Sequence, residues 1–241
     1  MMREVKTRFG ESHLGFAWLF IEPLIFIIPI VVFWSMRGHT QHGLPLVEFI
    51  LTGYPPFILW RNCVSRSRAA ISGNSGLLYH RMITPARIVL ARCLLEIAAS
   101  FISIGITYII FIYIQWAKPP AIISYFLLGW LYMAAISWAS AVFLSALTEV
   151  SVVMAKIIGT LTYLMLAIGG VFYMVEWMPN SLHPYLVWVP TVQAFELIRD
   201  GYFGDAVKAH WSLINMIFCF LVPATLGLHI LGFAREHLEL E

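Results

Sequence analysis

Charged residues are scarce in this chain of 241 residues: Asp, Glu, Lys and Arg make up 12%. Soluble domains carry about 25%, so the composition excludes an ordinary soluble protein. Hydrophobic residues reach 60%, and no polar block is long enough for a soluble catalytic domain. Apolar stretches of membrane-spanning length recur along the chain, whereas a transmembrane barrel would show short alternating segments. The sequence therefore predicts an all-α membrane protein with several spans.

Motifs for metal, nucleotide and redox chemistry are missing. The three cysteines, Cys63, Cys93 and Cys219, are isolated within apolar segments, which fits neither a metal site nor a disulfide framework. The eight histidines form no HExxH pair, and none of the four lysines follows a glycine-rich turn. We expect no catalytic residues, no metal and no cofactor on this chain.

A Ser-Gly pair in the stretch ISGNSG raises the alternative of an intramembrane serine protease. Ser72, however, lies between the basic residues Arg68 and Arg81, which places it at the cytoplasmic surface. His229 is also near the inner end of its span, but no geometry pairs it with a nucleophile. Proteolysis is disfavoured.

One membrane domain over 1–241 with six spans accounts for the apolar stretches. The spans lie at about 16–36, 46–68, 87–115, 121–147, 151–174 and 211–234. With the N-terminus inside, the inner side receives nine basic residues: Arg3, Lys6, Arg8, Arg66, Arg68, Arg81, Arg87, Arg92 and Arg235. The outer side receives four: Arg37, Lys118, Arg199 and Lys208. This bias predicts that both termini are cytoplasmic.

Two further segments are predicted beside the spans. Residues 1–15 combine spaced apolar residues with Arg3, Lys6 and Arg8, which fits an amphipathic helix at the membrane surface. The alternative is a basic flank that only sets topology. Residues 177–205 are too polar to cross the membrane, yet rich in prolines and aromatic side chains. We predict re-entrant helices dipping into the outer leaflet, with an ordinary surface loop as the alternative.

Five charges lie at least five residues from either end of a predicted span, all in the cytoplasmic half: Glu22, Arg61, Arg92, Glu96 and Lys156. A charge at this depth needs a partner, or a place in a protein interior or water-filled path. Arg92 and Glu96 are four residues apart on one helical face, which favours an ion pair that fixes helix registry. For Glu22 and Arg61, a polar vestibule that admits a charged headgroup is the functional interpretation.

Four stretches resemble one family in order along nearly the whole chain. They are TRFGESHLGFAWLFIEP, FILTGYPPFILW, NSGLLYHRMITPARIVLARCLLE and VPTVQAFELIRDGYFG. Together they resemble the permease subunit of capsular polysaccharide ABC exporters, the KpsM/Wzm type, with a type-2 ABC exporter fold. Two departures are an added proline in Tyr54-Pro55-Pro56 and Ser75 in place of a more usual Gln.

The resemblance implies a coupling helix at about 74–84 that docks into a separate ATPase. Its residues are Asn74, Gly76, Leu77, Leu78, Tyr79 and Arg81. It also implies a homodimer with two ATPase subunits of the KpsT type, which bind ATP and Mg and carry out hydrolysis. Further expected partners are a periplasmic co-polymerase-like protein, an outer-membrane exporter and membrane lipids. No nucleic-acid partner is expected.

Within this framework the chain is expected to move lipid-linked capsular polysaccharide through a canal between two copies. Headgroup-loading candidates are Arg3, Lys6, Arg8, Glu22 and Arg61. Canal-lining candidates, chosen because aromatic faces stack on sugars, are Phe16, Phe20, Phe26, Tyr163, Phe172 and Tyr173. Outer-gate candidates are Trp177, Tyr185, Trp188, Glu196 and Arg199. The alternatives are a permease for O-antigen, teichoic acid, a drug or haem, and a stand-alone channel or intramembrane enzyme.

Overall fold

The computed structural model describes residues 25, 29, 32, 40–68 and 84–238. Across them the chain is mostly helical, which confirms the predicted all-α class. The long helices are α3 (Leu46–Ser67), α5 (Pro85–Tyr113), α6 (Ile123–Val150), α7 (Val152–Ile168), α9 (Pro190–Phe203) and α10 (Leu213–Leu238). Shorter elements are the strands β1 (Thr40–Gln41) and β2 (Leu44–Pro45), the 3-10 turns η2 (Val175–Trp177) and η3 (Gly204–Ala206), and α8 (His183–Leu186). The predicted interface helix, the first span apart from residues 25, 29 and 32, and residues 74–83 of the coupling helix lie outside the described residues.

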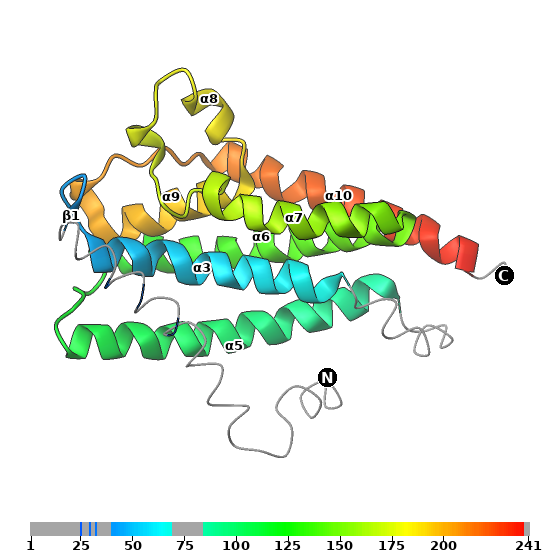
Figure 1. Cartoon of the computed structure of the whole chain (residues 1–241), viewed down its shortest axis with the longest axis horizontal. Coiled ribbons are helices and arrows are strands. Elements are labelled where there is room, and N and C mark those ends of the chain that lie inside the picture. The colour runs from blue at the N-terminus through cyan, green and yellow to red at the C-terminus, as the bar shows by residue number, and fades with distance from the viewer. Residues whose placement is uncertain (1–24, 26–28, 30–31, 33–39, 69–83, 239–241) are drawn as a thin grey trace, which may run out of the picture.

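The long helices run roughly along one axis, with α6 at the centre of the bundle (Figure 1). The β1–β2 hairpin and the α5–α6 connection lie at one end, which we call the hairpin end, and α8 projects sideways from the bundle in the half nearer to that end. The α6–α7 junction at Ser151 and the C-terminal end of α10 lie at the other, the Ser151 end. Loops predicted to share one side of the membrane therefore lie at the same end of the bundle.

Helix composition matches a bilayer environment. Among the described residues, three helical segments are long and apolar enough to cross a membrane: Pro85–Tyr113, Ile123–Glu149 and Leu213–Gly232. A fourth, Val153–Ile168, is apolar but shorter. Helix α3 contains Glu48, Arg61 and Arg66 and lies between α5, α6, α7 and α9, so its polar groups have protein neighbours.

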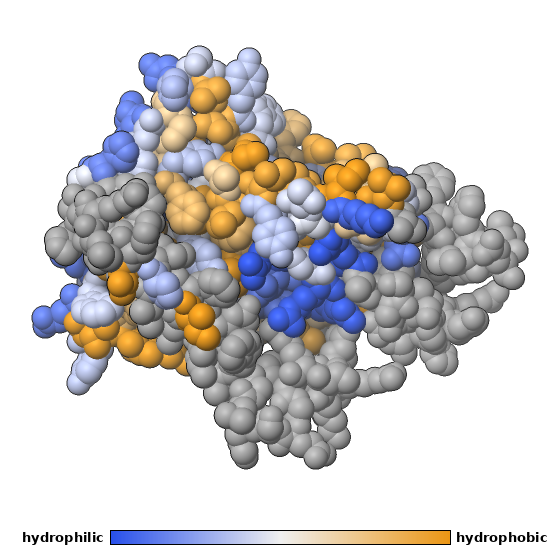
Figure 2. Space-filling model, viewed as in Figure 1, coloured by the Kyte–Doolittle hydropathy of each residue, from blue (hydrophilic) through white to orange (hydrophobic). Residues whose placement is uncertain are grey.

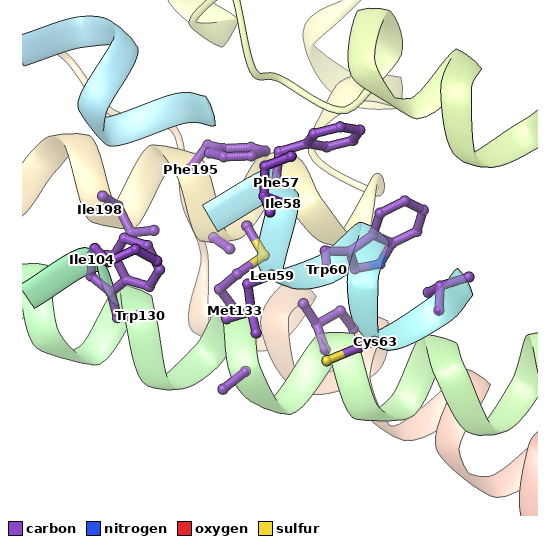
Figure 3. Packing of buried hydrophobic residues seen from close by; sticks show 14 of the residues in the cluster. Phe57, Ile58, Leu59, Trp60, Cys63, Ile104, Trp130, Met133, Phe195 and Ile198 are labelled. Atoms are coloured by element: carbon purple, nitrogen blue, oxygen red, sulfur yellow. The ribbon is translucent and has the colours of Figure 1, made fainter. Parts of the chain in front are cut away.

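The core forms where α3, α6 and α9 meet (Figure 3). Leu59 and Cys63 of α3, Met133 of α6 and Phe195 and Ile198 of α9 are completely buried there. Hydrocarbon tails are as apolar as these side chains, so helix association rests on close packing and interhelical hydrogen bonds. The hydroxyl groups of Tyr108 and Tyr132 supply two such bonds, to the carbonyl oxygens of Leu51 (2.8 Å) and Met216 (3.1 Å).

Helix α7 ends at Ile168, six residues before the predicted boundary of the fifth span at 174. Two glycines follow, and Gly170 has a φ of +94°, a left-handed conformation that ends the helix easily because glycine has no Cβ. Phe172 and Tyr173, predicted on this span, lie in the non-helical segment beyond it.

Candidate functional site: the α9 cap and a polar face on α3 and α7

Residues 169–212, which include η2, α8, α9 and η3, form a cap at the hairpin end (Figure 1). Its centre is Arg199 of α9, a completely buried side chain. The Arg199 guanidinium donates hydrogen bonds to the carbonyl oxygens of Gly170 (2.8 Å), Val171 (2.5 Å) and Tyr173 (2.6 Å). It also lies 4.0 Å from the ring centroid of Phe49. One side chain thus holds the segment after α7 against α9 and α3.

Three more buried polar residues of α9 tie the cap's connecting segments to the helix. The Glu196 carboxylate accepts hydrogen bonds from the backbone N–H groups of Val175 (3.0 Å) and His210 (2.8 Å). The Gln193 amide donates to the Val187 carbonyl at 2.7 Å and accepts from the Ser212 N–H at 2.8 Å. The Thr191 hydroxyl donates to the Gly169 carbonyl at 3.0 Å. Buried polar groups satisfied in this way fix a single loop arrangement.

Close approach of α3 to the cap requires Gly53. A Cβ at this position would lie 2.4 Å from the carbonyl oxygen of Val171 and 2.9 Å from the Arg199 guanidinium. Any larger residue would push away the segment that Arg199 binds. Gly53 belongs to the second of the four stretches that carry the family resemblance.

A separate cluster lies on the solvent-facing part of the cap. The Glu176 carboxylate is 2.5 Å from the His210 ring nitrogen Nε2 and 3.6 Å from Lys208 Nζ. The hydrogen bond from His210, with the nearby Lys208 charge, holds the pKa of Glu176 below its usual range. The Glu176 carboxylate is therefore fully ionised above about pH 4.3, and its contribution to the contact falls as the pH drops through the lowered pKa.

The second feature is a polar face on α3 and α7. Arg61, Ser65 and Arg68 are spaced i, i+4, i+7 on one face of α3, and all three are partly exposed. On α7, Lys156, Thr160 and Tyr163 form an exposed stripe at the same spacing, with Tyr163 72% exposed. Figure 2 shows hydrophilic side chains gathered over the C-terminal half of α3 and the start of α7. A polar stripe on an apolar helix is unfavourable against lipid and favourable against water or protein.

The two helices are joined at the Ser151 end. The Arg68 guanidinium donates to the Ala155 carbonyl of α7 at 3.1 Å. Arg66 Nε lies 3.2 Å from the buried Glu96 carboxylate of α5, and the Arg92 guanidinium donates to the Arg66 carbonyl at 3.0 Å. Glu96 therefore links α5 to α3. Glu96 thus forms an ion pair with Arg66, which comes from a different helix, and the pair predicted between Arg92 and Glu96 stays a prediction.

Only some of the sequence-predicted site residues lie in the described part of the chain. The coupling residues Asn74, Gly76, Leu77, Leu78, Tyr79 and Arg81, the loading candidates Arg3, Lys6, Arg8 and Glu22, and the canal candidates Phe16, Phe20 and Phe26 lie outside it. Arg61 and Tyr163 fall on the polar face.

The remaining candidates lie in or beside the cap. Phe172 packs partly buried against the core, and the Tyr173 hydroxyl donates to the Ile168 carbonyl. Trp177 stacks on His42, with ring centroids 4.3 Å apart. Tyr185 and Trp188 are 74% and 55% exposed, as interfacial aromatic residues are. Glu196 and Arg199 are buried, so they position the cap rather than line an opening.

Sequence reasoning missed Gln193, Thr191, Thr160 and Glu48. The Glu48 carboxylate, at the start of α3, accepts a hydrogen bond from the Lys118 N–H at 2.9 Å and so ties α3 to the α5–α6 connection. The spacing of Gln193, Glu196 and Arg199 on one helical turn after another was visible in the sequence. Their backbone partners were not, because those carbonyl and N–H groups come from segments up to 29 residues away.

Comparison with known proteins adds a family and its relatives. Residues 1–203 match the family ABC2_membrane, described as ABC-2 type transporter. The chain is 36% identical over 233 residues to the capsule polysaccharide export inner-membrane protein CtrC of Neisseria meningitidis, covering 96% of this chain and 88% of that protein. It is 35% identical to BexB of Haemophilus influenzae, a protein of the same description, over 96% and 86% of the two chains. It is 26% identical to the polysialic acid transport protein KpsM of Escherichia coli, over 91% and 88%.

Proposed function

Because the chain belongs to the ABC-2 type transporter family and matches capsule polysaccharide export proteins along most of its length, we propose that it is the membrane subunit of an ATP-driven exporter of capsular polysaccharide. The protein resides in the inner membrane, as its relatives do by name, and ATP hydrolysis belongs to a partner ATPase. We propose that it carries lipid-linked polysaccharide from the cytoplasm through a canal between two copies of this chain.

The polar stripe on α7 is the observation that carries the canal proposal. Lys156, Thr160 and Tyr163 follow one face of a mostly apolar helix, next to the polar residues of α3. A sugar polymer cannot pass through hydrocarbon, because each hydroxyl without a hydrogen-bond partner costs several kcal/mol. Two copies that face each other through this stripe enclose a wet path of the kind the polymer needs. The Tyr163 ring adds a flat surface on which sugars can slide.

The contacts at the Ser151 end support a route for mechanical coupling. The predicted coupling residues, 74–84, lie in the connection from α3 to α5. Arg66 and Glu96 join those two helices to each other, and Arg68 joins α3 to α7. Movement imposed on this connection by the ATPase would therefore reach the stripe-bearing helix through hydrogen-bonded, packed contacts rather than through a loose linker.

The cap supports a gating role at the outer end of the canal. Its 14-residue helix α9 spans about 21 Å, too short to cross a bilayer of about 30 Å. Every polar side chain that we describe on its buried face bonds to a connecting segment. We propose that the cap is a rigid re-entrant plug that narrows the outer mouth, with Trp177, Tyr185 and Trp188 at its surface and periplasmic and outer-membrane partners beyond it.

A deletion strain tests the function. Removal of the gene is expected to abolish surface polysaccharide, measured by capsule-specific staining, and a plasmid copy should restore it. Affinity purification of the tagged chain should recover an ATP-hydrolysing subunit, because this chain supplies only the passage through lipid. An unchanged capsule in the deletion strain would show that capsular polysaccharide is not the substrate. A chain that purifies without any ATPase would contradict its assignment to an ATP-driven exporter.

The basic N-terminal segment is proposed to bind the anionic end of the lipid-linked polymer at the cytoplasmic leaflet. Glu22 and Arg61 are proposed to lie on the path by which that end enters the canal. Changing Arg3, Lys6 and Arg8 together to Glu reverses the local charge, and each basic residue near an anionic surface contributes about 1 kcal/mol. We expect roughly tenfold or greater loss of surface polysaccharide at normal protein levels. A matched change to Lys, Arg and Lys keeps the charge and should preserve export. Normal export by the Glu variant would remove this binding role.

A further inference from the structure

An apolar cavity of about 430 Å³ lies between α7 and α10, both of which pack on α6. Its floor includes Ser140 and Phe143 of α6, and one wall includes Leu161 and Met165 of α7. Phe218 contributes to the opposite wall, on α10. The space is open to the outside of the bundle, so a molecule from the surroundings can enter it.

The lining chemistry excludes sugar and ordered water. Apart from the Ser140 and Thr191 hydroxyls and the Cys219 thiol, the side-chain surface of the cavity is hydrocarbon or aromatic. The Thr191 hydroxyl is already bonded to the Gly169 carbonyl, and the Cys219 thiol lies 3.5 Å from the Trp188 carbonyl. A water molecule needs two to four polar partners, and an apolar cavity without them stays dry.

The cavity and the polar stripe lie on different sides of α7. At about 100° per residue, Leu161 and Met165 are roughly 150° around the helix from the stripe centred on Lys156 and Tyr163. The exposed α7 residues between them are apolar, among them Leu164 at 51% exposure.

The opposite rim of the cavity, on α10, is equally apolar. Val222 and Leu226 line the cavity there and are 51% and 48% exposed. Figure 2 shows apolar side chains over this part of the bundle. These side chains belong to helical segments with the composition of membrane spans, so the medium outside the mouth is the hydrocarbon of the bilayer.

We propose that this cavity binds one acyl chain of a bilayer phospholipid, inserted between α7 and α10. An acyl chain restores the dispersion contacts that an empty cavity loses and carries no polar group along its length. Trp188 lines the cavity and is half exposed in the cap, which places the lipid headgroup at the hairpin end, where an indole ring suits the membrane interface. The bound chain fills the space behind α7 and so holds the polar stripe on the other side in place.

Tryptophan quenching by brominated phospholipid tests the proposal, because Trp60 lines the cavity while its side chain is only 4% exposed. The full chain is reconstituted in vesicles of phospholipid brominated on the acyl chains, with no polysaccharide present. The emission component that is lost in Trp60→Phe should be quenched at least about twofold, because a brominated chain in the cavity would contact the Trp60 ring that lines it. The control is Trp130→Phe: Trp130 is equally buried, at 3%, but packs against Phe101 and Phe126 away from the cavity, so its component should not be quenched.

A second variant tests the quenching of Trp60 without replacing a tryptophan. Val222 is half exposed at the mouth, so Val222→Phe narrows the opening with little strain and should reduce quenching of Trp60. A Trp60 component that is no better quenched than that of Trp130, or quenching that Val222→Phe leaves unchanged, would overturn the proposal. A disulfide between two copies of Val222→Cys would also overturn it, by showing that a second copy covers the cavity.

Discussion

Replacement of Arg199 with methionine is expected to release the cap and to destabilise the protein by about 3 kcal/mol or more, since three buried carbonyl groups lose a charged donor. The affected carbonyls are those of Gly170, Val171 and Tyr173, all within 2.8 Å of the guanidinium. The melting temperature of the purified protein, followed by loss of monodisperse material on heating, should fall by roughly 6 °C or more. Surface polysaccharide should fall with it, because a displaced cap no longer shapes the outer mouth.

The matched control removes a cation from the surface of the same cap. Lys208→Met deletes a side chain that is 74% exposed and pairs only loosely with Glu176, so its melting temperature should stay within about 2 °C of wild type. Arg199→Lys keeps the charge but not the planar fork of donors, and should fall between the two. Wild-type melting of Arg199→Met would show that the buried hydrogen bonds do not hold the cap.

A cysteine in place of Tyr163 is expected to react with a small charged methanethiosulfonate at least ten times faster than a cysteine in place of Leu164. Thiols react as thiolates, which form readily in water and poorly in an apolar medium. The two positions are adjacent on α7 and therefore at the same depth, with 72% and 51% of their side chains exposed. They differ in the face they occupy, so the rate ratio measures whether the stripe is wet. Modification of Tyr163→Cys should also block export more than tenfold.

The native thiols give a low background for this experiment. Cys63 and Cys93 are completely buried and Cys219 is nearly so, which makes the unsubstituted chain the reference. Equal labelling rates at 163 and 164 would show that both faces of α7 meet the same medium, and would leave the canal without its structural support. Fast labelling at 163 with unimpaired export would keep the water path but remove polysaccharide from it.

Hydropathy was nearly sufficient to predict where the helices lie. The predicted second span at about 46–68 coincides with α3 (Leu46–Ser67), and the predicted third span at 87–115 coincides with α5 (Pro85–Tyr113). Apolar runs and the positions of proline are local properties, so they can be seen in the sequence. The boundary of α7 was placed too late, because the apolar run continues past Gly169 and Gly170 while the helix does not.

The candidate site residues also divide into those that the sequence could identify and those whose role depends on the folded structure. Arg61 and Tyr163 were predicted from residue type and position, and both fall on the polar face. Glu196 and Arg199 were also selected, as candidates for the outer gate, and the structure shows them bonded to backbone groups inside the cap. Which atoms a buried side chain satisfies depends on distant segments that meet only in the folded protein, and no spacing rule encodes that meeting.

Composition and the order of motifs alone determined that this chain is a helical membrane protein of the capsule-export type, because hydropathy and residue identity act locally and survive in a linear string. Tertiary structure decided which flank of α7 is polar and which borders a cavity, since a helix has no front or back until its neighbours are placed. It also decided that Glu96 links to Arg66 across two helices, and that Gly53 makes room for the segment held by Arg199. These contacts depend on distances of a few ångströms between residues far apart in sequence, and packing sets those distances.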